Sequence, residues 1–273
     1  MSTQYLNPNE IVDYTIKSGV TKINKSYFKV FLSAIMAGIF IAIGAASSNA
    51  ASFSITNASL AKVITGAVFP VGLMLIVIIG ADLFTSNCLL SMAVLDKKIT
   101  FLSMLKNLII VYSGNFVGAF TIALIEITTG QFEAGNGALG GLHIIIASHK
   151  LDASFMQALL LGILCNIVVC GAALIMYAGK DIASKLLGCF FPISAFIIAG
   201  FQHSIANMYY FPAAILAKSN IDFVNASNIS AEHLENLTWK NFFINNLIPV
   251  TIGNIIGGSI IMGCVFWYLN KKK

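Results

Sequence analysis

The chain has 273 residues, of which 58% are hydrophobic and only 10% are charged, and its formal net charge is +5. A soluble domain carries about 25% charged residues, so a water-soluble fold of this length could not cover its surface. The positive charge comes only from lysines scattered between apolar runs, which argues against a nucleic-acid partner. With a mean hydropathy of +0.86, the composition predicts a helical protein embedded in the lipid bilayer.

The first 27 residues precede every apolar run. They carry several charges and lack the hydrophobic stretch that is typical of a cleavable signal peptide. Asn7 followed by Pro8 is the pattern of a helix N-cap and a first helical residue. We therefore expect a short helix from Pro8 to about Gly19, lying at the membrane interface within a cytoplasmic N-terminal segment, 1–27.

Six apolar runs follow, each long enough to cross about 30 Å of hydrocarbon. They are expected at about 28–47, 60–80, 101–128, 153–178, 184–200 extended to 217, and 241–269. Residues 28–270 then form a single six-helix transmembrane domain, and 271–273 form a cytoplasmic lysine tail. Most of the polar sequence falls in three outer loops, expected at 48–59, 130–152 and 218–240.

The lysines predict the orientation of the chain in the membrane. Six crossings put both termini on one side, and 12 of the 16 lysines fall on that side. The exceptions are Lys62, Lys150, Lys218 and Lys240. Because basic residues favour the cytoplasmic side, we expect a multi-pass protein of the plasma (inner) membrane with both termini in the cytoplasm.

An internal repeat relates the two halves of the chain. The third run contains Gly-Asn-Phe-Val-Gly at 114–118, and the sixth contains Gly-Asn-Ile-Ile-Gly at 253–257. Three crossings per half make the second half, about 153–269, inverted relative to the first, about 28–129. We expect Asn115 and Asn254 to bond across helices, with the adjacent glycines permitting close approach.

The middle helix of each half is interrupted. The second run meets a polar segment after Gly80, and the fifth run meets one after Gly200. Irregular backbone at membrane depth is tolerated only where it is buried in protein or lines an aqueous cavity. Paired broken helices therefore indicate a pathway for a substrate between the two repeats.

Two ionisable residues lie in these breaks. His203 is the only histidine within a predicted span, and an intramembrane ionisable group is a functional hypothesis by default; the alternative is a neutral histidine bonded across helices. Asp82 would repel an anion, so we expect it to cap a helix or to bond backbone donors. The five cysteines show no metal-ligand spacing and are expected as buried apolar thiols, with no metal and no cofactor.

Three strings, at 80–86, 162–170 and 201–212, carry a resemblance to a known family. At these residues the chain resembles the formate/nitrite transporter family, whose members include formate, nitrite and hydrosulfide channels. The strings are spread over both halves, so the resemblance covers nearly the whole chain. It implies an all-α, aquaporin-like fold of six transmembrane helices in two inverted three-helix repeats, with broken second and fifth helices, assembled as a homopentamer with one pore per protomer.

The resemblance also assigns roles to residues at matching positions. It implies that His203 is the central pore histidine, that Thr85 is the gating-loop threonine, and that Lys150 attracts anions at the outer funnel. Asn166 and Asn207 fall on matching polar positions. The implied pore constrictions are Phe69, Leu73, Leu83, Phe84, Val169 and Phe196. One departure is Gln202, where many members of the family have a glutamate; a formal charge beside the histidine is thereby lost.

These features predict a passive, pH-sensitive channel for small monovalent anions of weak acids, and not an enzyme. The changed residue at Gln202 favours hydrosulfide slightly over formate and nitrite. The alternative is an obligately proton-coupled anion symporter on the same fold. An aquaporin would carry paired Asn-Pro-Ala motifs, and a hydrolase would need a third partner for Ser204 and His203; the sequence offers neither.

Overall fold

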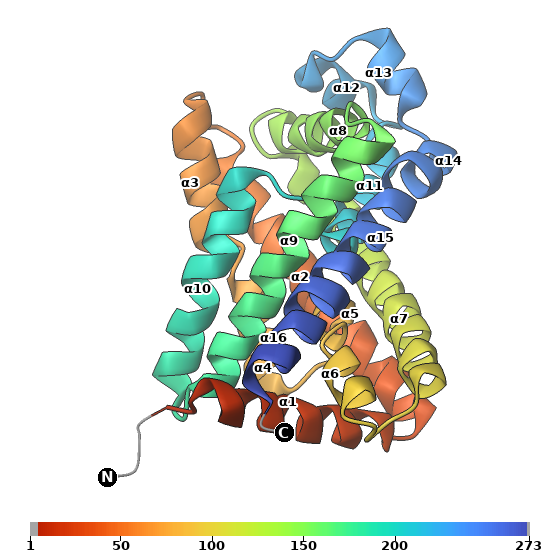
Figure 1. The fold of residues 1–273 in the computed structure, drawn as a ribbon. Coiled ribbons are helices and arrows are strands. Elements are labelled where there is room, and N and C mark those ends of the chain that lie inside the picture. The colour runs from red at the N-terminus through yellow and green to blue at the C-terminus, as the bar shows by residue number, and fades with distance from the viewer. Residues whose placement is uncertain (1–4, 272–273) are drawn as a thin grey trace.

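The computed structural model describes residues 5–271, which fold almost entirely into helices (Figure 1). The long apolar helices are α2 (Tyr27–Ser52), α7 (Phe101–Thr128), α9 (Phe155–Ala178) and α10 (Ile182–Ala199). Two further spans are built from consecutive pieces: α3 (Ala58–Val68) with α4 (Val71–Ile79), and α14 (Trp239–Asn241), η2 (Phe242–Leu247), α15 (Ile248–Ile255), η3 (Ile256–Val265) and α16 (Phe266–Asn270). The shorter elements are α1 (Pro8–Ile23), α5 (Phe84–Asn87), α6 (Leu90–Leu95), η1 (Gln131–Glu133), α8 (Ala138–Leu151), α11 (Ser204–Ala217), α12 (Ile221–Ser227) and α13 (Ala231–Asn236).

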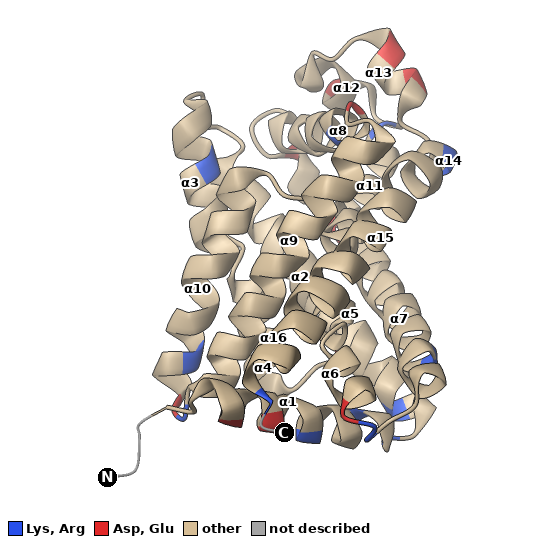
Figure 2. Cartoon of the chain, viewed as in Figure 1, with Lys and Arg blue, Asp and Glu red and all other residues tan. Residues whose placement is uncertain are grey.

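All six predicted spans are confirmed as helices long and apolar enough to cross a membrane. The third matches its predicted bounds, and four others differ from theirs by at most five residues. The fifth ends at Ala199, and its predicted extension to 217 is the separate helix α11. Figure 2 shows that lysine and acidic residues gather at the two ends of the helix bundle, with few between them. We call these the α1 end and the α8 end, after the short helix that lies at each.

The N-terminal helix forms where Asn7 and Pro8 predict it, and it runs four residues beyond the expected end at Gly19 to Ile23. Asn7 accepts a hydrogen bond from the backbone of Glu10, and the Glu10 carboxylate accepts one from the backbone of Asn7. This reciprocal cap fixes the first turn. The helix lies across the α1 end and packs against α6, α9 and α16 (Figure 1). Beyond Lys271, the predicted lysine tail lies outside the described residues.

Two of the segments expected as outer loops, 130–152 and 218–240, contain short helices. Ala138–Leu151 forms helix α8, with Leu139, Ile144 and Ala147 buried. The helix has only 14 residues, too few to span hydrocarbon, so its apolar sequence did not register as a span. It packs against α11 and α12 at the α8 end, and it brings Lys150 toward the second helix break.

Glycines of the repeated strings allow the helices of each half to approach closely. A Cβ atom on Gly118 would lie 2.1 Å from the backbone oxygen of Ile35, and one on Gly253 would lie 2.1 Å from that of Leu159. The pair α2 and α7 in the first half thus corresponds to α9 and α15 in the second. This geometry confirms that the glycines at both strings serve close helix packing.

The cysteines lie mostly in the interior. Cys88, Cys165, Cys170 and Cys189 are buried, and Cys264 is partly buried. All five are free thiols. The prediction of buried apolar thiols is confirmed for four of them, and Cys264 is the exception.

Candidate transport site

Both interrupted helices break in the same way. Helix α4 ends before Gly80 and α10 ends before Gly200, and each glycine has a positive φ, of 87° and 75°. This left-handed backbone conformation favours glycine, because glycine has no Cβ atom. The chain then runs without helix through 80–83 and 200–203 before α5 and α11 begin. The two breaks are therefore equivalent elements of the two repeats.

A buried asparagine holds each break in place. The Asn115 side chain donates to the backbone oxygens of Ala34 (2.8 Å) and Asp82 (3.1 Å) and accepts from the backbone nitrogen of Phe84 (2.9 Å). The Asn254 side chain makes the same three bonds, to Gly162 (2.8 Å), Gln202 (3.0 Å) and Ser204 (2.9 Å).

The expected cross-helix role of both asparagines is confirmed. The matching bonds also equate Leu83 with His203, because each residue lies between the two that its asparagine bonds.

The imidazole of His203 joins the two breaks. Its Nε2 lies 2.9 Å from the hydroxyl oxygen of Thr85, and its Nδ1 lies 3.1 Å from the backbone nitrogen of Ala206. Both side chains are buried, at 3% and 0% exposure. Because the backbone N–H can only donate, Nδ1 accepts, and the neutral ring carries its proton on Nε2 and donates it to Thr85. His203 therefore also caps α11. Thr85 lies in the first turn of α5 and not in a loop.

The two predicted polar residues Asn166 and Asn207 lie in different surroundings. Asn166 donates to the backbone oxygens of Thr85 (3.2 Å) and Asn254 (2.6 Å), so it holds the threonine through its backbone and not through its hydroxyl. Asn207 donates to the side chains of Gln202 (2.9 Å) and Asn246 (2.7 Å). With its amide hydrogens used by protein acceptors, each asparagine shapes the site through its neighbours.

The predicted constriction residues are all buried, and they divide into separate contacts. The rings of Phe69 and Phe196 pack edge to face at 5.7 Å, and Phe196 lies 6.0 Å from the His203 ring. Leu73 and Val169 line a cavity of about 230 Å³ on the other side, toward the α1 end.

Two constriction residues belong to the first break. Leu83 is fully buried at the start of α5. The ring of Phe84 packs on Tyr112 of α7 at 4.8 Å.

A polar chain leads from His203 toward the α8 end. The ammonium of Lys150 donates to the Gln202 side-chain oxygen (3.0 Å) and lies 5.4 Å from the Tyr210 ring centroid. The Gln202 oxygen also accepts from Asn207. These partners are neutral, and desolvation of the ammonium lowers the pKa of Lys150 to about 8. An anion that reaches this point would meet a positive charge that has no carboxylate beside it in these contacts.

The first break carries a charged cluster at the α1 end, which corrects the expectation for Asp82. Its carboxylate neither caps a helix nor bonds backbone donors. It accepts from Ser33 (2.9 Å) and Lys25 (3.2 Å), and it lies 3.4 Å from the ammonium of Lys22. The cavity of about 230 Å³ opens beside this cluster, with Lys22, Lys25 and Asp82 among its lining residues.

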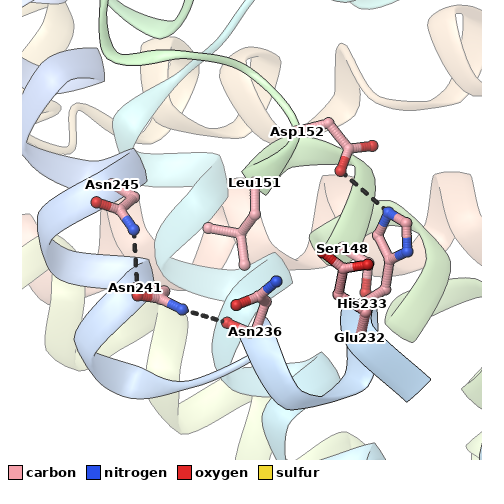
Figure 3. A pocket seen from close by; sticks show the side chains of 8 residues that line it. All are labelled: Ser148, Leu151, Asp152, Glu232, His233, Asn236, Asn241 and Asn245. Carbon is pink, nitrogen blue, oxygen red and sulfur yellow. Dashed lines mark hydrogen bonds and ion pairs between the residues drawn. The ribbon is translucent and has the colours of Figure 1, made fainter. Parts of the chain in front are cut away.

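A second cavity, of about 260 Å³, lies at the α8 end (Figure 3). His233 of α13 contacts the Asp152 carboxylate at 3.1 Å across it. Its lining is polar and acidic: Ser148, Leu151, Asp152, Glu232, His233, Asn236, Asn241 and Asn245. It borders the segment that carries Lys150, but its carboxylates suit an anion poorly.

Several residues of these clusters were missed from the sequence. Lys22 and Lys25 stand among other interfacial lysines, and Asn246 stands among other asparagines at the start of the sixth predicted span, so neither type is distinctive there. The repeat itself offered one signal. Asp82 and Gln202 occupy equivalent places, and each accepts a hydrogen bond from lysine, one toward the α1 end and one toward the α8 end.

Comparison with known proteins decides the family. A family model described as "Formate/nitrite transporter" matches residues 9–268. The chain belongs to the formate/nitrite transporter family. It is 37% identical to the formate channel FocA of Haemophilus influenzae, over 99% of this chain and 97% of that protein. It is also 37% identical to the formate channel FocA of Escherichia coli K12, over 98% and 95%.

Solved structures of the formate/nitrite transporter family share the fold. One described as a pentameric formate channel with formate bound superposes with a TM-score of 0.80 at 34% identity, covering 89% of this chain and 97% of that one. An ion channel of the family superposes equally well, with a TM-score of 0.80 at 24% identity, over 95% and 98%. The family and the six-helix fold are therefore confirmed, and the chain is a multi-pass membrane protein of a family of transport channels.

Proposed function

We propose that this protein is a passive channel for small monovalent anions of weak acids, with formate as its first candidate substrate. The observation that carries the proposal is the buried contact between His203 and Thr85, which joins the two helix breaks. A lysine lies toward the α8 end of this contact and a lysine-lined cavity lies toward the α1 end. Formate channels are among the relatives at 37% identity, which supports formate over the slight preference for hydrosulfide that Gln202 suggested.

The proposed path is narrow and apolar near its centre. Phe69 and Phe196 pack together beside the His203 ring, and rings in such a position can gate by excluding water. Lys150 raises the local concentration of anions at the α8 end, and Leu73, Leu83, Phe84 and Val169 complete the apolar surroundings. Passage depends on pH because both the weak acid and Lys150 titrate.

Orientation and assembly belong to the same proposal. The lysine count supports a plasma (inner) membrane protein whose α1 end and termini face the cytoplasm. Large apolar side chains such as Leu105, Leu187 and Phe191 are exposed on the flanks of the single chain, which suits contact with lipid and with neighbouring subunits. By analogy with the solved pentameric formate channel, we expect a homopentamer with one path in each subunit.

Stopped-flow flux in proteoliposomes tests the substrate class. Formate, nitrite, hydrosulfide, acetate and lactate are compared with and without a pH gradient. When the two pH values are equal at the start, a channel passes formate down its own gradient without moving protons. An obligate symporter moves one proton with each formate and therefore acidifies the receiving side. If none of the small anions passes, the proposed function is wrong.

Substitution of His203 tests the site. His203→Asn keeps a side-chain acceptor for the α11 cap but removes the Nε2 donor that faces Thr85. We expect this variant to fold and to lose most of the flux. Unchanged flux with an unchanged pH dependence would exclude a role for the imidazole in passage.

A further inference from the structure

A second group of buried ionisable side chains lies away from the proposed path, toward the α8 end. It consists of Glu126 near the end of α7, Tyr209 in α11 and His143 in α8, exposed by 4%, 0% and 0%. The Tyr209 hydroxyl contacts Oε2 of Glu126, and it lies 2.9 Å from Nε2 of His143. Nδ1 of His143 lies 2.8 Å from the backbone oxygen of Leu139. These three side chains form a chain of consecutive contacts across three helices.

The protons in this chain can be counted from its far end. The Leu139 oxygen can only accept, so Nδ1 of His143 carries a proton. In a neutral ring Nε2 is then an acceptor, and the Tyr209 hydroxyl donates to it. Tyr209 has only one proton, so its contact with Glu126 is satisfied only if the carboxyl group donates. Every contact is made, and every group is neutral, when Glu126 is protonated.

The other proton arrangements are less favourable. An ionised Glu126 beside a neutral His143 leaves two acceptors facing the one proton of Tyr209. An imidazolium with a carboxylate also satisfies the contacts, but it buries separated charges. Burial lowers the pKa of His143 to about 4, which disfavours that arrangement. In addition, the second carboxyl oxygen of Glu126 is buried and has no hydrogen-bond partner among residues 5–271, a costly place for a carboxylate.

The surroundings of the chain are aromatic. Phe132 of η1 stacks on the imidazole at 4.2 Å, and Phe223 of α12 packs against Phe132 at 6.1 Å. The further titratable group in contact is Tyr210, whose ring lies 5.5 Å from that of Tyr209. Tyr210 also lies under the Lys150 ammonium. Helix α8 therefore meets α11 twice, through His143 on Tyr209 and, two turns later, through Lys150 on Tyr210.

We propose that Glu126 keeps its proton at neutral pH and that Glu126, Tyr209 and His143 form a neutral buried chain that fastens α8, and with it Lys150, to α11. Glu126 is then a proton-binding site outside the transport path, and Tyr209 and His143 are positioning residues for the anion-attracting lysine. The protonated acid does not depend on which anion the protein passes.

Infrared spectroscopy of the full-length protein in lipid at pH 7 tests the proposal. We expect the carbonyl band of a protonated carboxylic acid, lost in Glu126→Gln, whose amide can donate to Tyr209 in the same way. Tyr209→Phe should shift the band because the acid loses its acceptor, whereas Tyr210→Phe, the matched control, should leave it in place. No carboxylic acid band, or a band that survives in Glu126→Gln, overturns the proposal, and so does a band that Tyr209→Phe does not move.

Two further measurements keep the test decisive. If Glu126→Gln does not fold, wild-type protein carrying glutamate labelled with carbon-13 at the side-chain carboxyl should show the band displaced, and an unlabelled position of the band would refute the assignment. In thermal unfolding, the melting temperature of Glu126→Gln should lie within about 2 °C of wild type, as expected for a change of less than about 1 kcal/mol in the free energy of unfolding. The melting temperature of Tyr209→Phe should be several degrees lower. Equal losses in both variants would contradict a neutral acid.

Discussion

Replacing Thr85 by valine isolates the contact between the two helix breaks. Valine keeps the branched shape of threonine but removes the hydroxyl that lies 2.9 Å from Nε2 of His203. Both residues are almost fully buried, so water cannot take the place of the lost hydroxyl as a partner for the Nε2 proton. Leaving a buried donor unpaired costs about 1–3 kcal/mol, which is about 5–150-fold in the population of the paired arrangement.

We therefore expect Thr85→Val to reduce formate flux in proteoliposomes at least about fivefold, the lower limit of that range. Thr85→Ser, the control, keeps the hydroxyl and should retain most of the flux. Both variants are compared at equal reconstituted protein, with size-exclusion profiles to verify assembly. Equal flux through the valine and serine variants would refute the reasoning, and loss in serine alone would show that the methyl group matters instead.

Three further predictions address the charges and the packing. First, flux should fall as the pH at the α8 end rises through about 8, because desolvation lowers the pKa of Lys150 to about 8 and the amine is charged only below that value. In a series of flux measurements at different pH, Lys150→Met should remove this fall. Substitution of the exposed Lys240 by methionine, the control, should leave it in place. Second, the free energy of unfolding of the double variant Lys22→Met, Lys25→Met should be about 3–5 kcal/mol lower than that of wild type, because the buried Asp82 carboxylate is left without its cations. Adding Asp82→Asn should restore part of this loss. A double variant as stable as wild type would contradict the role of this cluster. Third, Gly253→Ala should give no folded protein in size-exclusion chromatography, because its Cβ would lie 2.1 Å from the Leu159 oxygen. Gly171→Ala, the control, should behave as wild type, because the nearest neighbouring atom to its Cβ would be 3.9 Å away. Equal yields of the two variants would mean that the helices can separate.

The six spans and the repeat could be predicted because they depend on local patterns. Length and hydropathy determine which segments can cross a membrane, and a repeated Gly-Asn string survives in the sequence. Helix α8 escaped because it is apolar but too short to span. Its burial depends on α11 and α12, which only the folded chain brings next to it.

The site was predictable at single positions but not in its connections. His203 and Thr85 are separated by 118 residues, and nothing in their own neighbourhoods indicates that they touch; the family resemblance supplied both. Asp82 was assigned the wrong partners because the lysines that bind it lie 57 and 60 positions earlier, in the N-terminal segment outside the spans. Glu126 passed unnoticed for the same reason, since Tyr209 lies 83 residues away.

The asparagine contacts at the two breaks have a consequence for how the protein is made. Every partner of the Asn115 side chain lies in the first repeat, from Ala34 to Phe84. Every partner of Asn254 lies in the second, between Gly162 and Ser204. During synthesis, the first break can thus close once α7 has entered the bilayer, because no residue of the second repeat takes part in these three bonds. Each half can therefore secure its own break, and the contact between Thr85 and His203 joins the two halves.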